Sequence, residues 1–222
     1  MLLIRNLMIL CGLGALTPWP FAGAQTTAPR FAPAPPPAPD RSSTPAKELP
    51  GAALVATLKK DGYTLYFRHT SPDFSRDDVK SRSDDDCDNQ RPLTDKGRNE
   101  ARRIGEDIRK LGIPVSEVLA SPRCRTAEVA KLAFGNYRAA PEVRGGGFSE
   151  KPVERYHGLR ALFDKGPGPD RNTIIVSHGN PFYATAGEPY LAEGEAAVVK
   201  SLGNDFEVIA RVRWDGWREL LR

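Results

Sequence analysis

The sequence has few of the residues that bind metal ions or build disulfide frameworks. Among its 222 residues there are only three cysteines and three histidines, and they do not have the spacing of zinc ligands. The first fifty residues differ in composition from the rest. Roughly 170 residues then remain, which is enough to bury a core without such support. The sequence therefore predicts one ordinary folded domain and argues against a zinc site.

Neither charge nor hydrophobicity is concentrated in one long stretch. The formal net charge is only +4, and acidic and basic residues are interspersed after residue 50, so the basic stripe typical of nucleic-acid-binding proteins is missing. The apolar run near the N-terminus is interrupted by glycines and prolines and is too short to span a bilayer comfortably. We therefore expect no nucleic-acid partner. We also expect no stable membrane insertion once the signal peptide predicted at residues 1–24 is removed.

Residues 1–24 have the pattern of a secretory signal peptide. Arg5 supplies the positive charge, residues 7–16 form the apolar segment, and three small residues at 22–24 provide a cleavage site before Gln25. We expect the mature protein to be periplasmic or secreted. An uncleaved membrane anchor is the alternative.

Proline and alanine dominate residues 25–50. Such a segment cannot bury enough apolar surface to order itself, and it favours extended polyproline II conformations. We expect a disordered linker here, with a recognition peptide for a proline-binding partner as the alternative. The folded domain is expected over residues 51–222.

This domain alternates short apolar runs with amphipathic segments. The pattern predicts an α/β fold, a three-layer α/β/α sandwich with a mostly parallel central sheet and an antiparallel hairpin at one edge. Strands are expected within 64–70, at 115–120, within 172–180, at 196–202 and at 206–214. Helices are expected at 51–60, 94–111, 125–134 and 152–163, with a short one at the C-terminus.

Two of the three histidines and two arginines stand at the ends of predicted strands. Arg68 and His69 end the first strand, His178 ends a later one, and Arg125 follows the strand at 115–120. In open α/β sheets, ligands bind outside the carboxyl ends of the strands. Guanidinium groups bind phosphate oxygens bidentately. A neutral imidazole attacks phosphorus, and a second imidazole, if protonated, adds positive charge. These residues predict a phosphate pocket.

Four ordered motifs resemble those of the histidine phosphatase superfamily, whose fold is that of phosphoglycerate mutase. They are Arg68-His69-Thr70, where the family has Arg-His-Gly; Leu93-Thr94-Asp95-Lys96-Gly97 with Ala101; Ser121-Pro122 with Arg125; and Ser177-His178-Gly179. The resemblance extends over nearly the whole domain. It implies the phosphoglycerate-mutase-like version of the predicted sandwich.

The resemblance also implies an activity. The chain would be a metal-independent phosphoric monoester hydrolase that acts on a small phosphorylated substrate through a phosphohistidine on His69. Arg68, Arg125 and His178 would complete the phosphate pocket, and no metal or organic cofactor is implied. A phosphomutase is one alternative, and a phosphate-binding or scaffold domain with little or no turnover is another.

A general acid has to protonate the leaving oxygen when the leaving group is poor. The family's Glu-rich stretch after the second arginine motif is replaced here by Arg144 and three glycines. We expect the proton donor to be Glu195, with Glu193, Glu150 and Asp73 as alternatives.

Signal cleavage removes Cys11 and leaves Cys87 and Cys124. An even pair of cysteines in an exported protein favours a disulfide bond, with two free buried thiols as the alternative. Cys124 neighbours Arg125, and Cys87 belongs to a polar loop at 71–91 that is long enough to be a lid. A bridge would hold this loop beside the pocket.

Two loops carry no pattern that points to a substrate. They are the loop at 71–91 and the Gly-rich loop at 144–149, which we interpret as a plain loop. The sequence therefore does not name the natural substrate. We expect His157 on the surface of a helix.

Overall fold

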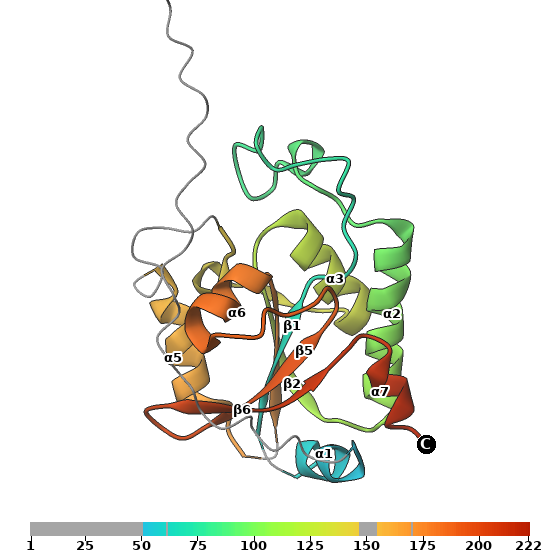
Figure 1. The fold of residues 1–222 in the computed structure, drawn as a ribbon, viewed down its shortest axis with the longest axis vertical. Coiled ribbons are helices and arrows are strands. Elements are labelled where there is room, and N and C mark those ends of the chain that lie inside the picture. The colour runs from blue at the N-terminus through green and yellow to red at the C-terminus, as the bar shows by residue number, and fades with distance from the viewer. Residues whose placement is uncertain (1–50, 61, 147–154, 170) are drawn as a thin grey trace, which may run out of the picture. The chain divides into compact units, whose positions relative to one another are not determined.

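The structure is a computed structural model whose described residues are 51–60, 62–146, 155–169 and 171–222 (Figure 1). The predicted signal peptide and linker fall within residues 1–50 and lie outside this part of the chain. Within the described ranges, no helix is long and apolar enough to cross a membrane.

Short apolar strands form one six-stranded mixed sheet, with the strand order β3-β2-β4-β1-β5-β6 (Figure 1). The first four strands of this order run parallel, whereas β5 is antiparallel to both β1 and β6. The expected mostly parallel sheet with an antiparallel hairpin at one edge is confirmed. The strands are β1 (Thr64–Arg68), β2 (Val115–Ala120), β3 (Arg138–Ala139), β4 (Asn172–Ser177), β5 (Ala196–Ser201) and β6 (Phe206–Val212).

Helices cover both faces of the sheet, which gives the expected three layers (Figure 1). One face is covered by α1 (Gly51–Leu58), α2 (Asp95–Lys110), α3 (Cys124–Phe134) and α7 (Gly216–Glu219). The other face is covered by α5 (His157–Lys165) and α6 (Gly179–Ala186). Two short 3-10 helices, η1 (Cys87–Asn89) and η2 (Pro141–Val143), lie in the connections.

The central strands alternate their side chains between two apolar clusters. In β1, Leu65 and Phe67 pack under α2 and α3, while Tyr66 packs on the opposite face with Phe163 and Phe182. Successive side chains of a strand point to opposite faces of the sheet. A strand that is buried on both faces therefore has consecutive apolar residues, and β1 has them at 65–67.

Helix α2 follows its sequence signals closely. The Thr94 hydroxyl accepts a hydrogen bond from the backbone N–H of Gly97 at 3.0 Å, which caps the helix as predicted. Ala101, Ile104 and Ile108 lie on its buried face. The helix ends just before Gly112, whose φ of 66° favours glycine.

Sequence reasoning missed β3 and α6 and placed one helix differently. Gly179 and Pro181 gave the segment after His178 the appearance of a loop, although proline is compatible with the first turn of a helix. Phe182 of α6 is buried in the cluster around Tyr66, so packing stabilises a helix that propensity does not predict. The helix predicted at 152–163 is observed as α5, from His157 to Lys165.

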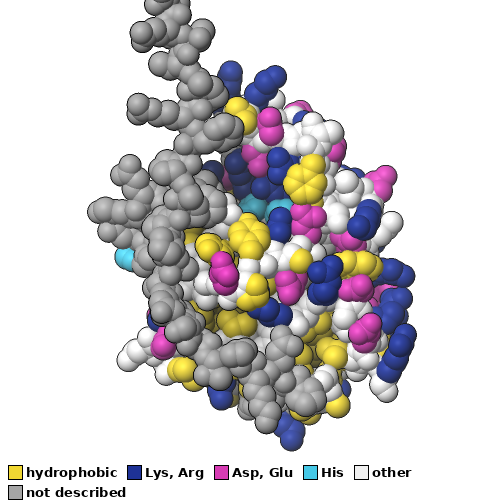
Figure 2. Space-filling view, in the orientation of Figure 1, with side chains coloured by type: hydrophobic (Ala, Val, Ile, Leu, Met, Phe, Trp, Pro, Cys, Tyr) yellow, Lys and Arg dark blue, Asp and Glu magenta, His cyan; other side chains and the backbone are white. Residues whose placement is uncertain are grey.

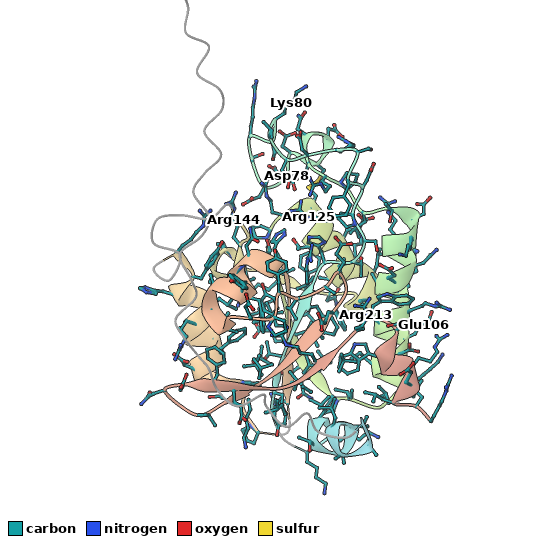
Figure 3. The ribbon with its side chains drawn as sticks, in the orientation of Figure 1. Asp78, Lys80, Glu106, Arg125, Arg144 and Arg213 are labelled. Carbon is teal, nitrogen blue, oxygen red and sulfur yellow. A yellow bond between two sulfur atoms is a disulfide. The ribbon has the colours of Figure 1, made fainter. Side chains whose placement is uncertain are left out.

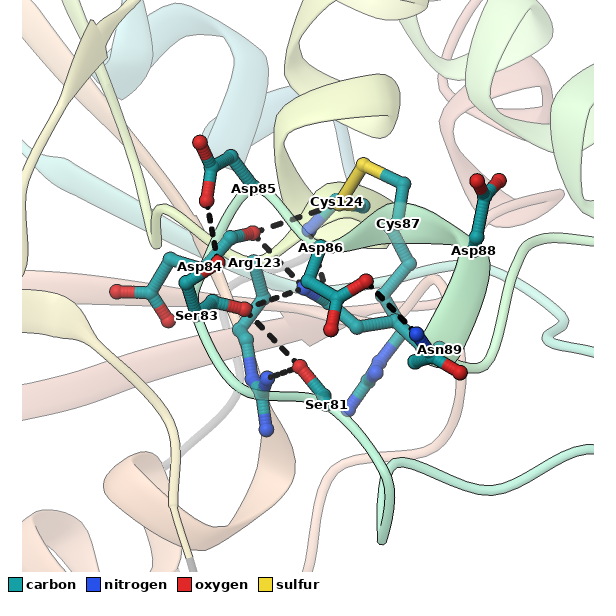
Figure 4. The surroundings of a disulfide bond; sticks show 12 residues. Ser81, Ser83, Asp84, Asp85, Asp86, Cys87, Asp88, Asn89, Arg123 and Cys124 are labelled. Carbon is teal, nitrogen blue, oxygen red and sulfur yellow. Dashed lines mark hydrogen bonds between the residues drawn. A yellow bond between two sulfur atoms is a disulfide. The ribbon is translucent and has the colours of Figure 1, made fainter.

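Residues 71–91, which we call the lid, are joined to helix α3 by a disulfide bond (Figure 4). Cys87 and Cys124 are bonded with their Cα atoms 5.6 Å apart, so the expected bridge is present. Gln90 adds to this attachment because it is fully buried and donates to two lid carbonyls at 2.8 and 3.1 Å. Its side-chain oxygen accepts from the backbone N–H of Cys124 at 3.0 Å.

Candidate active site

Three parallel strands bring the predicted site residues to one edge of the sheet. β1 and β4 pair in register to their last residues, and the backbone N–H of His69 donates to the carbonyl of Ser177 at 2.9 Å. β2 pairs with the other side of β4. His69, His178 and the start of α3, which bears Arg125, therefore leave the sheet as neighbours, with Arg68 at the tip of β1.

His69 is buried, with 6% of its surface exposed. Its Nδ1 lies 3.0 Å from the carbonyl oxygen of Thr70. Because a carbonyl only accepts, Nδ1 carries the proton and Nε2 keeps its lone pair. Burial, followed by the charge of Arg125, lowers the pKa of His69 to about 3. At neutral pH His69 therefore has the charge and the tautomer of a nucleophile.

His178 is buried next to His69, with 5.4 Å between the two ring centroids. Nη2 of Arg125 lies 3.3 Å from Nδ1 of His178. A guanidinium only donates, so Nδ1 accepts and the Nε2–H faces the Ser121 hydroxyl at 3.1 Å. Burial, followed by the neighbouring His69 and Arg125, lowers the pKa of His178 well below its ordinary value. In the free site His178 is therefore neutral and does not add positive charge.

Arg125 connects this pocket to the lid. Its Nη1 lies 3.0 Å from both carboxylate oxygens of Asp78, which also accepts from the backbone N–H of Arg91 at 2.8 Å (Figure 3). Although burial opposes ionisation, the Arg91 N–H and the charge of Arg125 hold the pKa of Asp78 below its ordinary value. Sequence reasoning missed Asp78 because no local pattern separates it from the other aspartates of the lid.

The loop that precedes β5 holds Arg68 next to His69. Nη1 of Arg68 donates to the carbonyl of Leu191 at 2.8 Å, and Nη2 contacts Oε1 of Glu193 at 3.3 Å. The backbone N–H of Gly194 donates to the carbonyl of His69 at 3.0 Å. This loop therefore sits directly against the end of β1.

Three buried donors at the site have no hydrogen-bond partner within the part of the chain that the structure describes. They are Nε of Arg68, Nε of Arg125 and Oγ1 of Thr70. A buried polar group left unpaired costs about 1–3 kcal/mol. An oxyanion would supply the acceptors that these groups lack.

The two glutamates of the β5 loop differ in their surroundings. Oε2 of Glu195, the proton donor favoured by the sequence, accepts from the backbone N–H of Ala192 at 2.6 Å and so closes a turn of its own loop. Glu193 instead contacts Arg68, and burial raises the pKa of Glu193 above its ordinary value. Of the two carboxylates, that of Glu193 is the one in contact with Arg68, whereas Glu195 accepts from the backbone N–H of Arg68 at 3.0 Å through its backbone carbonyl.

The other residues considered from the sequence make no hydrogen bond or ion pair with His69 within the described ranges, or lie outside them. Asp73 accepts hydrogen bonds from Ser75 within the lid, and these lower the pKa of Asp73. His157 is exposed on α5, as expected. Glu150 lies outside the described residues.

The Gly-rich segment, which was interpreted as a plain loop, is part of the site. A Cβ atom on Gly145 would lie 2.0 Å from Cδ2 of His178, so a side chain at this position would collide with the imidazole. Nε of Arg144 lies 2.9 and 3.0 Å from the carboxylate oxygens of Asp84 on the lid. The segment therefore borders His178 and binds the lid. Its residues 147–149 lie outside the described residues.

Arginines surround the two histidines. Figure 2 shows the histidine surface in cyan with dark-blue Lys and Arg side chains beside it. Besides Arg68 and Arg125, Arg91 contributes to the lowered pKa of His69, and Arg123 to that of His178. No group of three or more His, Cys, Asp or Glu that could hold a metal ion occurs in the described ranges. The pocket is therefore suited to an anionic ligand.

Comparisons with known proteins give structural neighbours only. Bacillus stearothermophilus YhfR is 16% identical, with a TM-score of 0.48, covering 67% of this chain and 95% of that chain. The protein histidine phosphatase SixA, complexed with tungstate, is 20% identical, with a TM-score of 0.47, covering 68% of this chain and 97% of that chain. A phosphoserine phosphatase from Entamoeba histolytica, in complex with 3-phosphoglyceric acid, is 12% identical, with a TM-score of 0.46. The match covers 67% of this chain and 95% of that chain.

No family model and no curated protein matches the chain. Two of these neighbours are themselves described as phosphatases, a property of those proteins.

The lowered pKa of His69 predicts a specific loss of stability in acid. The unfolded chain binds a proton near the ordinary pKa of 6.5, whereas the folded chain binds it only near 3. Stability is therefore full above about pH 6.5 and falls toward pH 3, by up to about 1.4 kcal/mol per pH unit for this one group. The free energy of unfolding, measured with urea at several pH values between 3 and 6.5, should fall less steeply with decreasing pH for His69→Asn than for the wild type. The same pH dependence in both proteins would contradict the prediction.

Proposed function

We propose that this domain is a phosphatase of the histidine phosphatase superfamily, which hydrolyses a phosphomonoester through a phosphohistidine on His69. The observation that supports this most directly is the setting of the nucleophile. A buried, neutral imidazole with a free Nε2 lies beside Arg68 and Arg125, whose Nε donors have no partner among the described residues. Arginines keep their charge at any physiological pH, so they bind phosphate without the help of a metal ion.

Substrate binding requires an exchange of anions at Arg125. The carboxylate of Asp78 now occupies Nη1 of this guanidinium at 3.0 Å. An incoming phosphate takes over these donors, or shares them, as the lid shifts. The dianion raises the pKa of both histidines. His69 starts from a pKa of about 3 and stays neutral, while the Nε2–H of His178 faces the same space as a neutral hydrogen-bond donor.

The reaction then proceeds in two displacements. Nε2 of His69 attacks phosphorus, the P–N bond forms, and the P–O bond to the leaving group breaks. The positive charge that develops on the ring is stabilised by the hydrogen bond from Nδ1–H to the Thr70 carbonyl. Water then attacks phosphorus, the P–N bond breaks, and inorganic phosphate leaves with His69 neutral again.

We place the proton donor at Glu193 rather than at Glu195. Glu193 contacts Arg68, a proposed ligand of the phosphate, and its raised pKa favours the protonated form that a general acid needs. In the first displacement its proton passes to the leaving oxygen. In the second displacement the resulting carboxylate accepts a proton from the attacking water.

We also propose that the protein acts outside the cytoplasm. The predicted signal peptide supports this, and so does the disulfide between Cys87 and Cys124, because such bonds persist in oxidising compartments. The bond attaches the lid to helix α3 beside Arg125. An oxidising compartment would therefore preserve the arrangement of the site.

The role of His69 is tested by trapping the phosphoenzyme. After an alkaline quench with labelled substrate, the wild type should retain a base-stable, acid-labile label, and His69→Ala should retain none. His178→Ala removes only part of the stabilisation of the transferring group, so labelling should slow by roughly a hundredfold without disappearing. His157→Ala, at an exposed position on the same chain, is the control. A base-stable label in His69→Ala would place the nucleophile elsewhere, and phosphate binding without turnover in the wild type would favour a binding domain.

The proton donor is identified by its dependence on the leaving group. The measurement is kcat/KM, which reports on the first displacement alone. For an alkyl phosphate, Glu193→Gln should lower kcat/KM by about a hundredfold, because the alkoxide needs a proton as it leaves. For p-nitrophenyl phosphate, whose leaving group needs little protonation, the loss in kcat/KM should be much smaller. Glu195→Gln is the matched comparison from the same loop. The same pattern in Glu195→Gln alone would move the donor there, and equal losses on both esters in Glu193→Gln would reduce its role to positioning Arg68.

Export and the disulfide are tested together by the intact mass of protein isolated from its native host. The mass should equal that of residues 25–222 without the two thiol hydrogens of Cys87 and Cys124, and alkylation before reduction should add nothing. A full-length chain would argue against signal cleavage. A mature chain with two alkylatable cysteines would instead argue against the disulfide alone.

A further inference from the structure

Two exposed aromatic side chains belong to the segments that enclose the phosphate pocket. Phe74, on the lid, is 67% exposed, and Tyr190, in the loop before β5, is 43% exposed. The large aromatic side chains of the core, such as Tyr66, Phe163 and Trp217, are fully buried. Exposed apolar surface gathered beside a polar site is typical of a ligand-binding groove. Figure 2 shows hydrophobic side chains in yellow beside the cyan histidine surface.

The ring of Tyr190 is fixed against the residues that follow the second histidine. A Cβ atom on Gly179 would lie 2.2 Å from the ring carbons, so the ring rests on the residue next to His178. The Tyr190 hydroxyl donates to Oδ1 of Asn180 at 2.6 Å. The guanidinium carbon of Arg68 lies 5.2 Å from the ring centroid. Tyr190 is therefore a rigid wall that adjoins both Arg68 and the His178 strand end.

The ring of Phe74 is held on the lid side by a second arginine. The guanidinium carbon of Arg91 lies 5.0 Å from the Phe74 centroid. Arg91 is fixed in turn, because its Nε donates to the carbonyl of Arg76 at 2.7 Å and its backbone N–H donates to Asp78 at 2.8 Å. Asp78 pairs with Arg125. The position of Phe74 is thereby linked to the phosphate-binding arginine.

We infer that the substrate is a phosphomonoester whose leaving group carries a planar ring, held between Phe74 and Tyr190 while the phosphate lies on Arg68 and Arg125. This inference rests on the proposed phosphatase activity and names the substrate class of the same site. The two walls come from different segments, the lid and the β5 loop, and each is tied to a phosphate-binding arginine: Tyr190 to Arg68 directly, and Phe74 to Arg125 through Arg91 and Asp78.

The chemistry of the walls favours a planar ring over other leaving groups. Each wall ring has a guanidinium against it, and this cation–π contact fixes the ring in place before the substrate arrives. Stacking between aromatic rings adds a factor of roughly two to ten in affinity for each contact beyond simple burial. A saturated group of the same size gains only the burial. A cationic leaving group is repelled by Arg68 and Arg91.

The inference is tested with benzyl phosphate and cyclohexylmethyl phosphate. Both esters release a primary alcohol of similar size and acidity, so a difference in kcat/KM reports on the ring and not on the leaving group. The wild type should prefer the benzyl ester by at least about fivefold. Phe74→Leu and Tyr190→Leu should each reduce this preference by roughly two- to tenfold, with cyclohexylmethyl phosphate still hydrolysed.

Conservative and distant variants separate stacking from general damage. Phe74→Tyr and Tyr190→Phe keep the rings and should keep the preference for the benzyl ester. Tyr137→Leu changes a tyrosine of similar exposure, 38%, away from the site, and should leave both rates unchanged. Equal rates on the two esters in the wild type, or a preference unchanged in both leucine variants, would overturn the inference while the phosphatase activity stands. Hydrolysis of p-nitrophenyl phosphate with neither of the two esters turned over would likewise overturn the inference alone. Absence of turnover of all three esters would overturn the proposed function and the inference with it.

Discussion

The buried guanidinium of Arg125 is the group on which the arrangement of the site depends. Only 9% of Arg125 is exposed, and a buried cation is costly unless an anion accompanies it. In the free protein that anion is Asp78 of the lid, and in the proposed complex it is the phosphate. Asp78 of the lid and the phosphate of the substrate would therefore compete to neutralise the same buried cation. The neighbouring disulfide at Cys124 keeps the lid within reach of both.

Burial also decides the state of the two histidines. Their low exposure and the surrounding arginines keep both imidazoles neutral, which leaves Nε2 of His69 available for attack. The same environment disfavours the protonated form of both histidines in the folded state, so the neutral form of His69 and the predicted loss of stability in acid have one cause. The site combines a positive field from guanidinium groups with two imidazoles that carry no charge themselves.

The sheet turns these local environments into a common site. Because β1, β4 and β2 run parallel and adjacent, the residues that follow them meet at one edge. This part of the fold was predictable, since strands buried on both faces read as continuous apolar runs and α2 has a hydroxyl cap and a single apolar face. Helix α6 was not predictable in the same way, because Gly179 and Pro181 resemble loop residues and only the packing of Phe182 makes the helix favourable.

The sequence by itself determined which side chains stand at the strand ends: Arg68 and His69 end one predicted strand, His178 ends another, and Arg125 follows the strand predicted at 115–120. It also favoured a bond between Cys87 and Cys124, on the expectation that signal cleavage removes Cys11. Only the tertiary structure decided what accompanies the site residues. It places Asp78 on Arg125, the carboxylate of Glu193 on Arg68, Gly145 against His178, and the exposed rings of Phe74 and Tyr190 beside arginines. The physical reason is the same in each case. These residues lie in loops, where no periodicity constrains the side chains, and their partners are set by long-range packing between segments far apart in the chain.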